Sequence, residues 1–287
     1  MRLAHARTRP IGQHLGMALL WVLGCSLALT AQTPAPASAD LVRQTVENEL
    51  KAADASANFM FRSRKETPHG SQTKLYVQTR EAMAGLLIAV DDQPLTAEQL
   101  QAEEAKLRSL VNNPDDLKRK QKQEKEDIDR VSRIVRALPN AFIYRYDGTD
   151  VGKAGVGSVG GELIRLKFQP NPRYNAPSRV EQMLTGMQGY LLIDASKHRI
   201  AKIDGSLYRD VNFGMGILGH LYKGGHFQVE QGEVGDRLWN VTHMRLEFTG
   251  KILIIKSLVI RTDESYSDFL RVPDDLTFAE GLALLKK

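Results

Sequence analysis

Apolar and polar residues alternate with a period of two over most of the second half of the chain. This alternation predicts strands at 141–146, 161–168, 189–194, 199–208, 226–234, 238–249 and 252–263. Short turn signals separate or interrupt them, among them Asp147-Gly148, Asp204-Gly205 and Thr249-Gly250. Strands so close in sequence pair antiparallel, because a parallel return needs a crossover of about a dozen residues or more.

The earlier part of the chain begins with a different period. Behind Asp40, which is suited to cap a helix, apolar residues recur at helical spacing at Leu41, Val42, Val46 and Leu50. The period then changes to two, and strands are predicted at 58–64, 73–79 and 86–90. The chain therefore enters the sheet soon after one short helix.

A polar helical segment interrupts the strands at about 96–138. Thr96 is suited to cap its start, and Pro114 divides it into two helices or kinks a single one. Residues 118–130 mix charges of both signs within each turn, which is typical of a solvated helix. Apolar residues three or four positions apart predict a seam that docks on the sheet, at Ile128, Val131, Val135 and Leu138. A last helix is predicted at 273–287.

These elements predict a mainly β fold with added helices. About ten strands form a meander that must curl to bury one face. We therefore expect a strongly curved antiparallel sheet or an incomplete β-barrel, with helices covering the concave side. Residues 40–287 are predicted to form a single β-rich domain that carries the helical insertion.

Residues 1–31 have the layout of a secretory signal peptide. Three arginines precede a stretch without charge at 11–30, and small residues follow it. Cleavage is expected after Ala31 or near Ala39, and 32–39 is a Pro/Ala linker. We expect export to the periplasm or to the outer membrane. A retained membrane anchor and lipidation of Cys25, the only cysteine, are the less favoured alternatives.

The net charge of +5 changes this picture little. Arg2, Arg7 and Arg9 all lie before the apolar stretch, and without them 36 basic side chains face 34 acidic ones. A nucleic-acid-binding protein concentrates basic charge on one face, and nothing in the mature sequence does so. A nucleic-acid partner is therefore not expected.

No motif in the chain predicts catalysis, a cofactor or a metal. The glycine-rich stretch 151–161 contains GxG, but a strand follows it, whereas a dinucleotide site needs a helix there. Alternate residues of two consecutive strands place His226, Gln228 and Glu230 on one face and His243, Arg245 and Glu247 on one face. Two histidines and a carboxylate can bind zinc. Arg245 argues against this, and a polar outer face is the favoured interpretation.

The stretch 210–227 combines glycines with large apolar residues. The favoured interpretation is a set of bends with core side chains between them. The functional alternative is an apolar lip at the mouth of a cavity. The residues predicted to line such a cavity are Leu191, Ile193, Phe213, Ile217, Leu218 and Phe227.

The sequence GYLLID at 189–194, followed by RIAKIDG at 199–205, resembles the periplasmic lipoprotein-sorting (LolA/LolB-like) proteins and related uncharacterised exported bacterial proteins. The resemblance implies a half-open barrel that holds acyl chains against inner helices. The charged insertion at 96–138 departs from that pattern, and no ligand-contacting residue can be transferred.

We therefore expect a periplasmic, non-catalytic carrier or binding protein for an acyl chain, a lipoprotein or another apolar ligand, working close to a membrane. A curved sheet of this size has an apolar inner face, and an unfilled inner face is a ligand pocket. The alternatives are an envelope structural or assembly protein and a metal- or carboxylate-dependent hydrolase. A co-purified lipid, a stable protein complex or bound zinc would distinguish the three.

Overall fold

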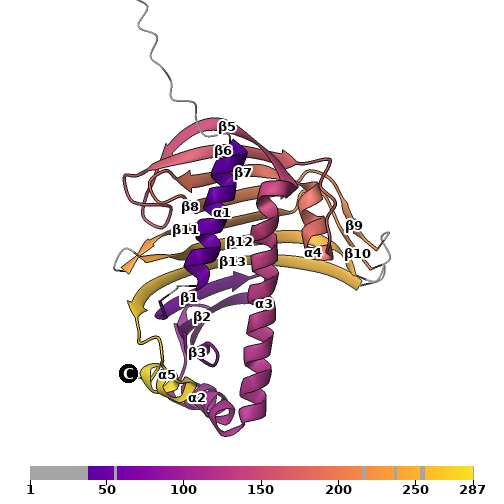
Figure 1. Ribbon diagram of the computed structural model, residues 1–287. Helices are drawn as coiled ribbons and strands as arrows, with labels where there is room; N and C mark the ends of the chain where they lie inside the picture. The colour runs from indigo at the N-terminus through magenta and orange to yellow at the C-terminus, as the bar shows by residue number, and fades with distance from the viewer. Residues whose placement is uncertain (1–37, 55–56, 215–217, 236–237, 253–255, 287) are drawn as a thin grey trace, which may run out of the picture. The chain divides into compact units, whose positions relative to one another are not determined.

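In the computed structural model, the described residues include thirteen strands, which form one antiparallel sheet (Figure 1). The structure describes residues 38–54, 57–214, 218–235, 238–252 and 256–286, all within the second of two units of the chain, Pro36–Lys287. The predicted signal peptide, Cys25 and nearly all of the predicted linker lie outside the described residues.

The main path of the sheet runs β4-β3-β2-β1-β13-β12-β11-β8-β7-β6-β5, with β10 beside β12 and β9 beside β10. The strands are β1 Phe59–Thr67, β2 Gly70–Val77, β3 Ala84–Val90, β4 Gln93–Pro94, β5 Phe142–Val151, β6 Glu162–Pro170, β7 Met187–Asp194, β8 Arg199–Leu207, β9 Val211–Phe213, β10 Gly219–Leu221, β11 His226–Val234, β12 Leu238–Ile252 and β13 Lys256–Arg271. Strands β4 and β5 end the path without pairing to each other, so the sheet is open. The predicted curved antiparallel sheet with helices is confirmed.

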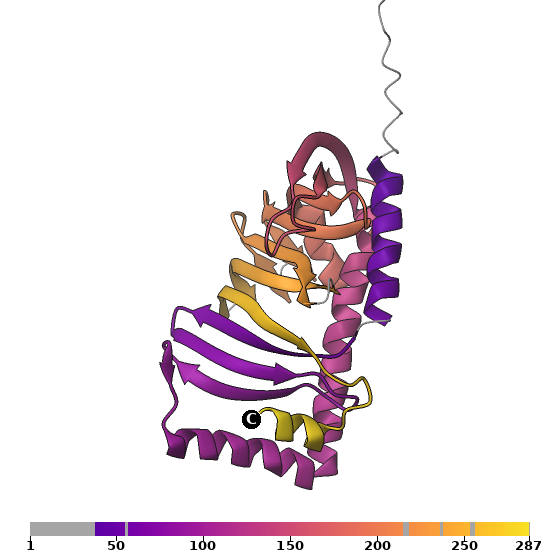
Figure 2. The ribbon, with the colours of Figure 1, turned by 90° about the vertical axis from the view of Figure 1, so that its left-hand side faces the viewer.

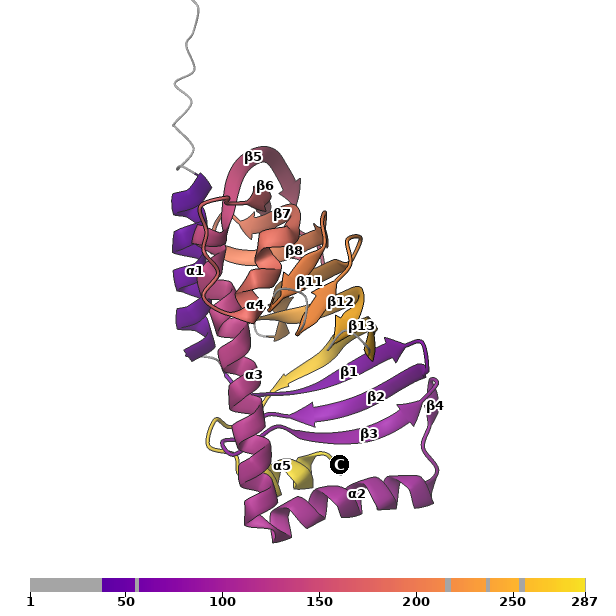
Figure 3. The same ribbon diagram turned by 90° about the vertical axis from the view of Figure 1, so that its right-hand side faces the viewer.

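Five α-helices accompany the sheet in the described residues. They are α1 Ser38–Asp54, α2 Ala97–Asn112, α3 Pro114–Ala141, α4 Arg179–Gln182 and α5 Phe278–Leu284, and a 3-10 helix at Met183–Gly186 follows α4. Helices α1 and α3 lie on the same side of the sheet (Figures 1 and 3). We call the sheet face toward them the inner face and the opposite face the outer face. None of the helices in the described residues is long and apolar enough to cross a membrane.

The helix boundaries follow from local capping. The Thr96 side chain accepts a hydrogen bond from the Gln99 backbone N–H, and the Gln99 side chain accepts one from the Thr96 backbone N–H. Asn113 caps α3 in turn, and Pro114 occupies its first turn, where a missing N–H costs nothing. The predicted break at Pro114 is confirmed as the junction of two helices.

The described residues form three apolar clusters, and the two larger ones lie at different ends of the sheet. The first core joins α1 and the end of α3 to β5–β8, and its fully buried members include Val42, Leu166, Leu191, Ile193 and Ile200. The second core joins α2 and α5 to β2 and β3, and it includes Val77, Leu86, Leu107, Phe278 and Leu282. Strands β1–β3 are seen from the side, with their whole length in view, in Figure 2, whereas β6–β8 are seen in this way in Figure 1. The sheet therefore twists strongly between the two cores.

An ion pair joins α1 to β8 at the first core. The Arg199 guanidinium donates to both carboxylate oxygens of Glu49, at 2.9 Å each, and the Ile200 backbone N–H donates to Glu49 Oε1 at 2.7 Å. Their side chains are only 18% and 11% exposed, so solvent screens the pair weakly. This contact fixes the helix on the sheet.

Three dipeptides predicted as turns lie inside strands. Asp147-Gly148 forms a bulge in β5, where Gly148 has a φ of +94°, a conformation that favours glycine. Positions 205 and 250 require glycine because atoms of neighbouring strands leave no room for a Cβ. An added Cβ would lie 2.4 Å from the Phe227 ring at Gly205, and 2.1 Å from the His220 carbonyl oxygen at Gly250. Strand β12 therefore continues past its predicted end at 249 to Ile252. Strand β13 continues past its predicted end at 263 because it pairs with β1 as far as Arg271.

Candidate functional site

The inner face carries a row of cross-strand neighbours that runs out of the first core. The register places Leu191 beside Ile203, Ile203 beside Val229, Val229 beside Met244, and Met244 beside Glu264. Leu191 is 1% exposed, whereas Ile203, Val229 and Met244 are only half-buried. The row is therefore apolar from Leu191 to Met244, and its residues become more exposed toward the middle of the sheet.

Four of the six residues predicted to line a cavity come together in the first core. Leu191 and Ile193 are fully buried there, and Phe213 and Phe227 pack against it with part of their surface open. Leu218 is 38% exposed, with its side chain against Gly214. Ile217 lies outside the described residues. That these residues line a ligand cavity stays a prediction.

An aromatic group occupies the inner face between the two cores. Phe61 stacks on Tyr76 and on Phe269, with ring centroids 5.5 Å apart in both pairs. Phe61 also lies against Tyr266, and Phe59 packs edge-on against Phe269. Burial raises the pKa of the Tyr76 hydroxyl, and the negative charges of Glu264 and Glu124 raise it further. Glu124 belongs to α3, so this helix lies near the aromatic group.

Glu264 is a buried charged residue of the same region. Its carboxylate accepts a hydrogen bond of 2.6 Å from the Ser63 hydroxyl, and its side chain is 12% exposed. The pKa of the Tyr266 hydroxyl is raised, first by burial and then by the charge of Glu264. The apolar row on the inner face therefore ends at a buried carboxylate surrounded by aromatic rings.

Helix α3 faces this region with a stripe of residues seven positions apart. Leu117 packs in the second core, Glu124 accepts a hydrogen bond from the Met83 backbone N–H at 2.9 Å, and Leu138 is buried in the first core. Val131 lies on the same stripe, because seven residues make almost two whole turns. Val131 is nevertheless 60% exposed, and Ile128 is 63% exposed. Every residue from 125 to 131 is exposed.

The predicted docking of the apolar seam is therefore correct only for its second half. Leu138 and Val135 pack against the first core, whereas Ile128 and Val131 are mostly exposed and belong to neither core. The helix is held at both ends and is uncovered between them. Sequence periodicity identified the apolar stripe, but it carries no information on how far the sheet lies from the middle of the helix.

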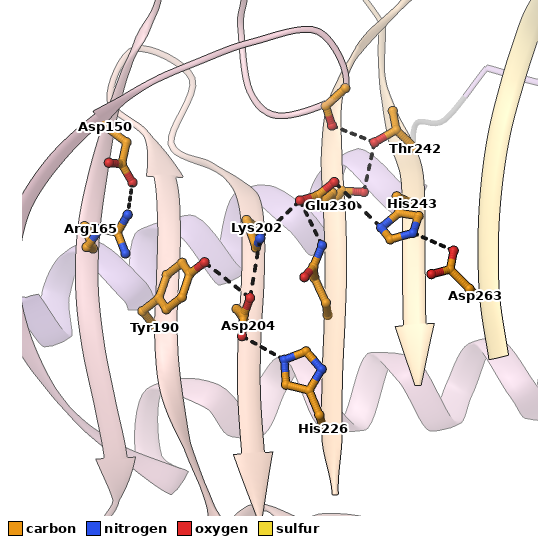
Figure 4. Close-up of polar contacts among 12 residues, drawn as sticks. Asp150, Arg165, Tyr190, Lys202, Asp204, His226, Glu230, Thr242, His243 and Asp263 are labelled. Carbon is orange, nitrogen blue, oxygen red and sulfur yellow. Dashed lines mark hydrogen bonds and ion pairs between the residues drawn. The ribbon is translucent and has the colours of Figure 1, made fainter. Parts of the chain in front are cut away.

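The outer face carries a polar network across neighbouring strands (Figure 4). The Lys202 ammonium lies 3.4 Å from Asp204 Oδ2 and 3.2 Å from Glu230 Oε1. Partial burial lowers the pKa of Lys202, but Glu230 and Tyr190 outweigh it, and the net shift is upward. The charge of Lys202 is thus compensated by two neighbouring carboxylates.

Two histidines take part in the same network. His226 Nε2 lies 3.0 Å from Asp204 Oδ1, and His243 Nε2 lies 2.8 Å from Asp263 Oδ1. The two predicted His strands do pair, with Glu230 opposite His243 and Gln228 opposite Arg245. Within the part of the chain that the structure describes, no three His, Cys, Asp or Glu side chains converge as a metal site requires.

A cleft of about 680 Å³ adjoins this network on the outer face of β5–β8. The register puts Arg145 beside Lys167, Lys167 beside Tyr190, and Gln188 beside Ser206. The outward side chains at its walls are Ile143, Arg145, Lys167, Gln169, Gln188 and Tyr190. Sequence reasoning did not identify this cleft, because its residues belong to four strands and only the register brings them together.

The chain matches no family model and no curated protein. Among solved structures, a similar chain is a DUF1329 family protein from Desulfovibrio piger. The two share 11% sequence identity over 82% of this chain and 92% of that chain, with a TM-score of 0.26. Similarity at this level carries no argument about fold or function. The molecule is an open, twisted antiparallel sheet with helices on its inner face.

Proposed function

We propose that this protein is a non-catalytic binding protein or carrier for an acyl chain or another apolar ligand, exported to the bacterial envelope. One observation carries the proposal. Between the two cores, the inner face is apolar and half-open at Val229 and Met244, and the stripe of α3 leaves Val131 exposed. Apolar surface on both sides of an uncovered region supports a ligand that lies between them.

The energetics suit an acyl chain. Each methylene removed from water contributes about 0.8 kcal/mol, so ten buried methylenes contribute about 8 kcal/mol before costs. A free energy of about 8 kcal/mol corresponds to a dissociation constant of about 1 μM. Loss of ligand freedom offsets part of this gain. The dissociation constant should therefore exceed about 1 μM, and such weak, exchangeable binding lets a carrier both load and release its ligand.

The buried carboxylate orients such a ligand. Glu264 ends the apolar row and keeps a hydrogen bond from Ser63. Lys65 Nζ lies 3.9 Å from Glu264 Oε2 and is half-exposed, so it offsets one negative charge weakly. An acidic head group would add a second negative charge in this poorly solvated region, which is unfavourable. We therefore assign the apolar end of the ligand to the region of Met244, and its head group to solvent.

The test is a titration of the mature protein with a fluorescent fatty acid, followed by thermal unfolding of each variant. Val131→Glu puts a carboxylate beside the bound chain, so we expect binding to weaken about tenfold or more. The matched control is Val259→Glu. Val259 is 66% exposed and lies on the outer face, since its neighbour Ile260 packs against the first core.

Both positions are exposed, so both variants should unfold at the temperature of the wild type. The control should bind the fatty acid as the wild type does. A folded wild type that takes up no apolar ligand contradicts the proposal, and so does equal binding by the two variants.

A further inference from the structure

The cleft on the outer face of β5–β8 has a positive rim. Lys167 Nζ lies 2.8 Å from Asp147 Oδ1, whereas Arg145 makes no ion pair within the residues that the structure describes. The pKa of Asp147 is lowered, chiefly by its hydrogen bond with Lys167, and the charges of Arg145 and Arg165 lower it further. Three cations therefore act near this rim against two carboxylates, because Arg165 pairs with Asp150, and Arg145 is the cation in excess.

The walls of the cleft also carry uncommitted polar groups. The side chains of Gln169, Gln188 and Ser206 make no hydrogen bond to other residues in the described part of the chain. Two primary amides and a hydroxyl offer both donors and acceptors. Ile143 adds an apolar patch that is 46% exposed. A sheet face that is merely solvated has no need of a cleft. The volume of this cleft, about 680 Å³, is within the usual range for small-molecule sites.

We propose that this cleft binds a small anionic ligand that carries hydroxyl groups, of the sugar-acid or sugar-phosphate class. Arg145 and Lys167 hold the acidic group, because a guanidinium and an ammonium are the usual partners of carboxylate and phosphate. The amides of Gln169 and Gln188 receive the hydroxyl groups, and Ile143 packs on the carbon skeleton. This site goes beyond the proposed function and is independent of it, because it lies on the opposite face of the sheet.

The experiment is a calorimetric titration of the full mature protein with four probes: glucuronate, glucose 6-phosphate, glucose and inorganic phosphate. We expect saturable binding of glucuronate, glucose 6-phosphate or both, with weaker binding of glucose and of inorganic phosphate. The two acidic sugars distinguish a carboxylate from a phosphate ligand. Raising the salt concentration should weaken binding, because the rim is exposed and its charges are screened.

Two variants locate the binding. Arg145→Gln and Lys167→Gln should each weaken the acidic sugar about tenfold, the loss expected when one charged hydrogen bond is removed. The matched control is Arg136→Gln, an exposed arginine on α3. It should bind as the wild type does, and all three variants should unfold at the wild-type temperature.

Several outcomes overturn the proposal. One is the failure of both acidic sugars to bind saturably, and another is unchanged affinity in Arg145→Gln and Lys167→Gln. Equal binding of glucose overturns the assignment of an anion, and equal binding of inorganic phosphate overturns recognition of the hydroxyl groups. Fatty-acid binding by the inner face is unaffected by any of these results, so the two proposals fail separately.

Discussion

Replacing Asp194 by asparagine tests how the end of β7 is held. Asp194 is fully buried. Its Oδ1 accepts hydrogen bonds from the Ser196 N–H at 3.0 Å, the Ser196 hydroxyl at 2.7 Å and the Lys197 N–H at 3.0 Å. Its Oδ2 accepts one from the Ser158 N–H at 3.0 Å. One carboxylate thus ties the turn after β7 to the loop between β5 and β6.

The cost of Asp194→Asn can be derived from these contacts. The amide oxygen can replace Oδ1 and keep three hydrogen bonds, but the NH₂ group then faces the Ser158 N–H, and two donors meet. A buried donor without a partner costs about 1–3 kcal/mol, and the three remaining bonds lose their charged acceptor. We predict a loss of about 3 kcal/mol in the free energy of unfolding. Urea denaturation at neutral pH measures it.

The pH dependence gives a second readout. Burial raises the pKa of the Asp194 carboxyl, but the hydrogen bonds from Ser196, Ser158 and Lys197 outweigh it and lower the pKa below its ordinary value. Because the pKa is lowered on folding, the stabilisation is complete above the pKa of the unfolded carboxyl, about 3.9. It is lost as the pH falls through the still lower pKa of the folded protein. The gap between wild type and Asp194→Asn should therefore shrink in acid.

Asp268→Asn is the control, since Asp268 is 63% exposed in its pair with Arg62 and should contribute under about 0.5 kcal/mol. The reasoning is refuted if Asp194→Asn costs no more than this control at neutral pH. It is also refuted if the gap between wild type and variant widens on acidification.

Two further substitutions test the packing of the sheet. Glu49→Gln should lower the free energy of unfolding by about 2 kcal/mol, because it leaves the Arg199 side chain, which is 18% exposed, without its counter-charge. Urea denaturation measures this loss, and no measurable loss would mean that α1 is held by apolar contacts alone. Gly205→Ala should cost about 1–3 kcal/mol by forcing the Phe227 ring aside, and a melting temperature equal to the wild type would contradict this close packing.

The strands were predictable because one face of the sheet is buried. Period-two alternation gave 226–234 for β11 and 199–208 for β8, which the structure places at His226–Val234 and Arg199–Leu207. Glycines gave the errors, since Gly250 reads as a turn in sequence but is required by the approach of β10. The last helix, predicted at 273–287, is shorter because Thr277 and Glu280 form a capping box that starts it only at Phe278.

The candidate sites were much less predictable. Leu191 and Ile193, which were predicted to line a cavity, are fully buried in the first core, and burial beneath α1 depends on tertiary packing that no local pattern encodes. The exposure of Val131 and the convergence of Arg145 with Gln188 depend on helix placement and on strand register. Sequence patterns determine which face a side chain occupies, and they do not determine what lies opposite it.

Strand β13 and helix α3 both connect the two cores, but in different ways. β13 pairs with β12 and β1, Leu258 and Ile260 pack against the first core, and the chain reaches Val272 of the second core directly after the strand. The middle of α3 is bare by contrast. Amide hydrogens in the centre of β13 should therefore exchange with solvent only when both cores open. Those of 125–131, in the middle of α3, should exchange through local opening of the helix. The sheet therefore couples the unfolding of one core to that of the other. The long helix couples them little, because only its two ends pack against the cores.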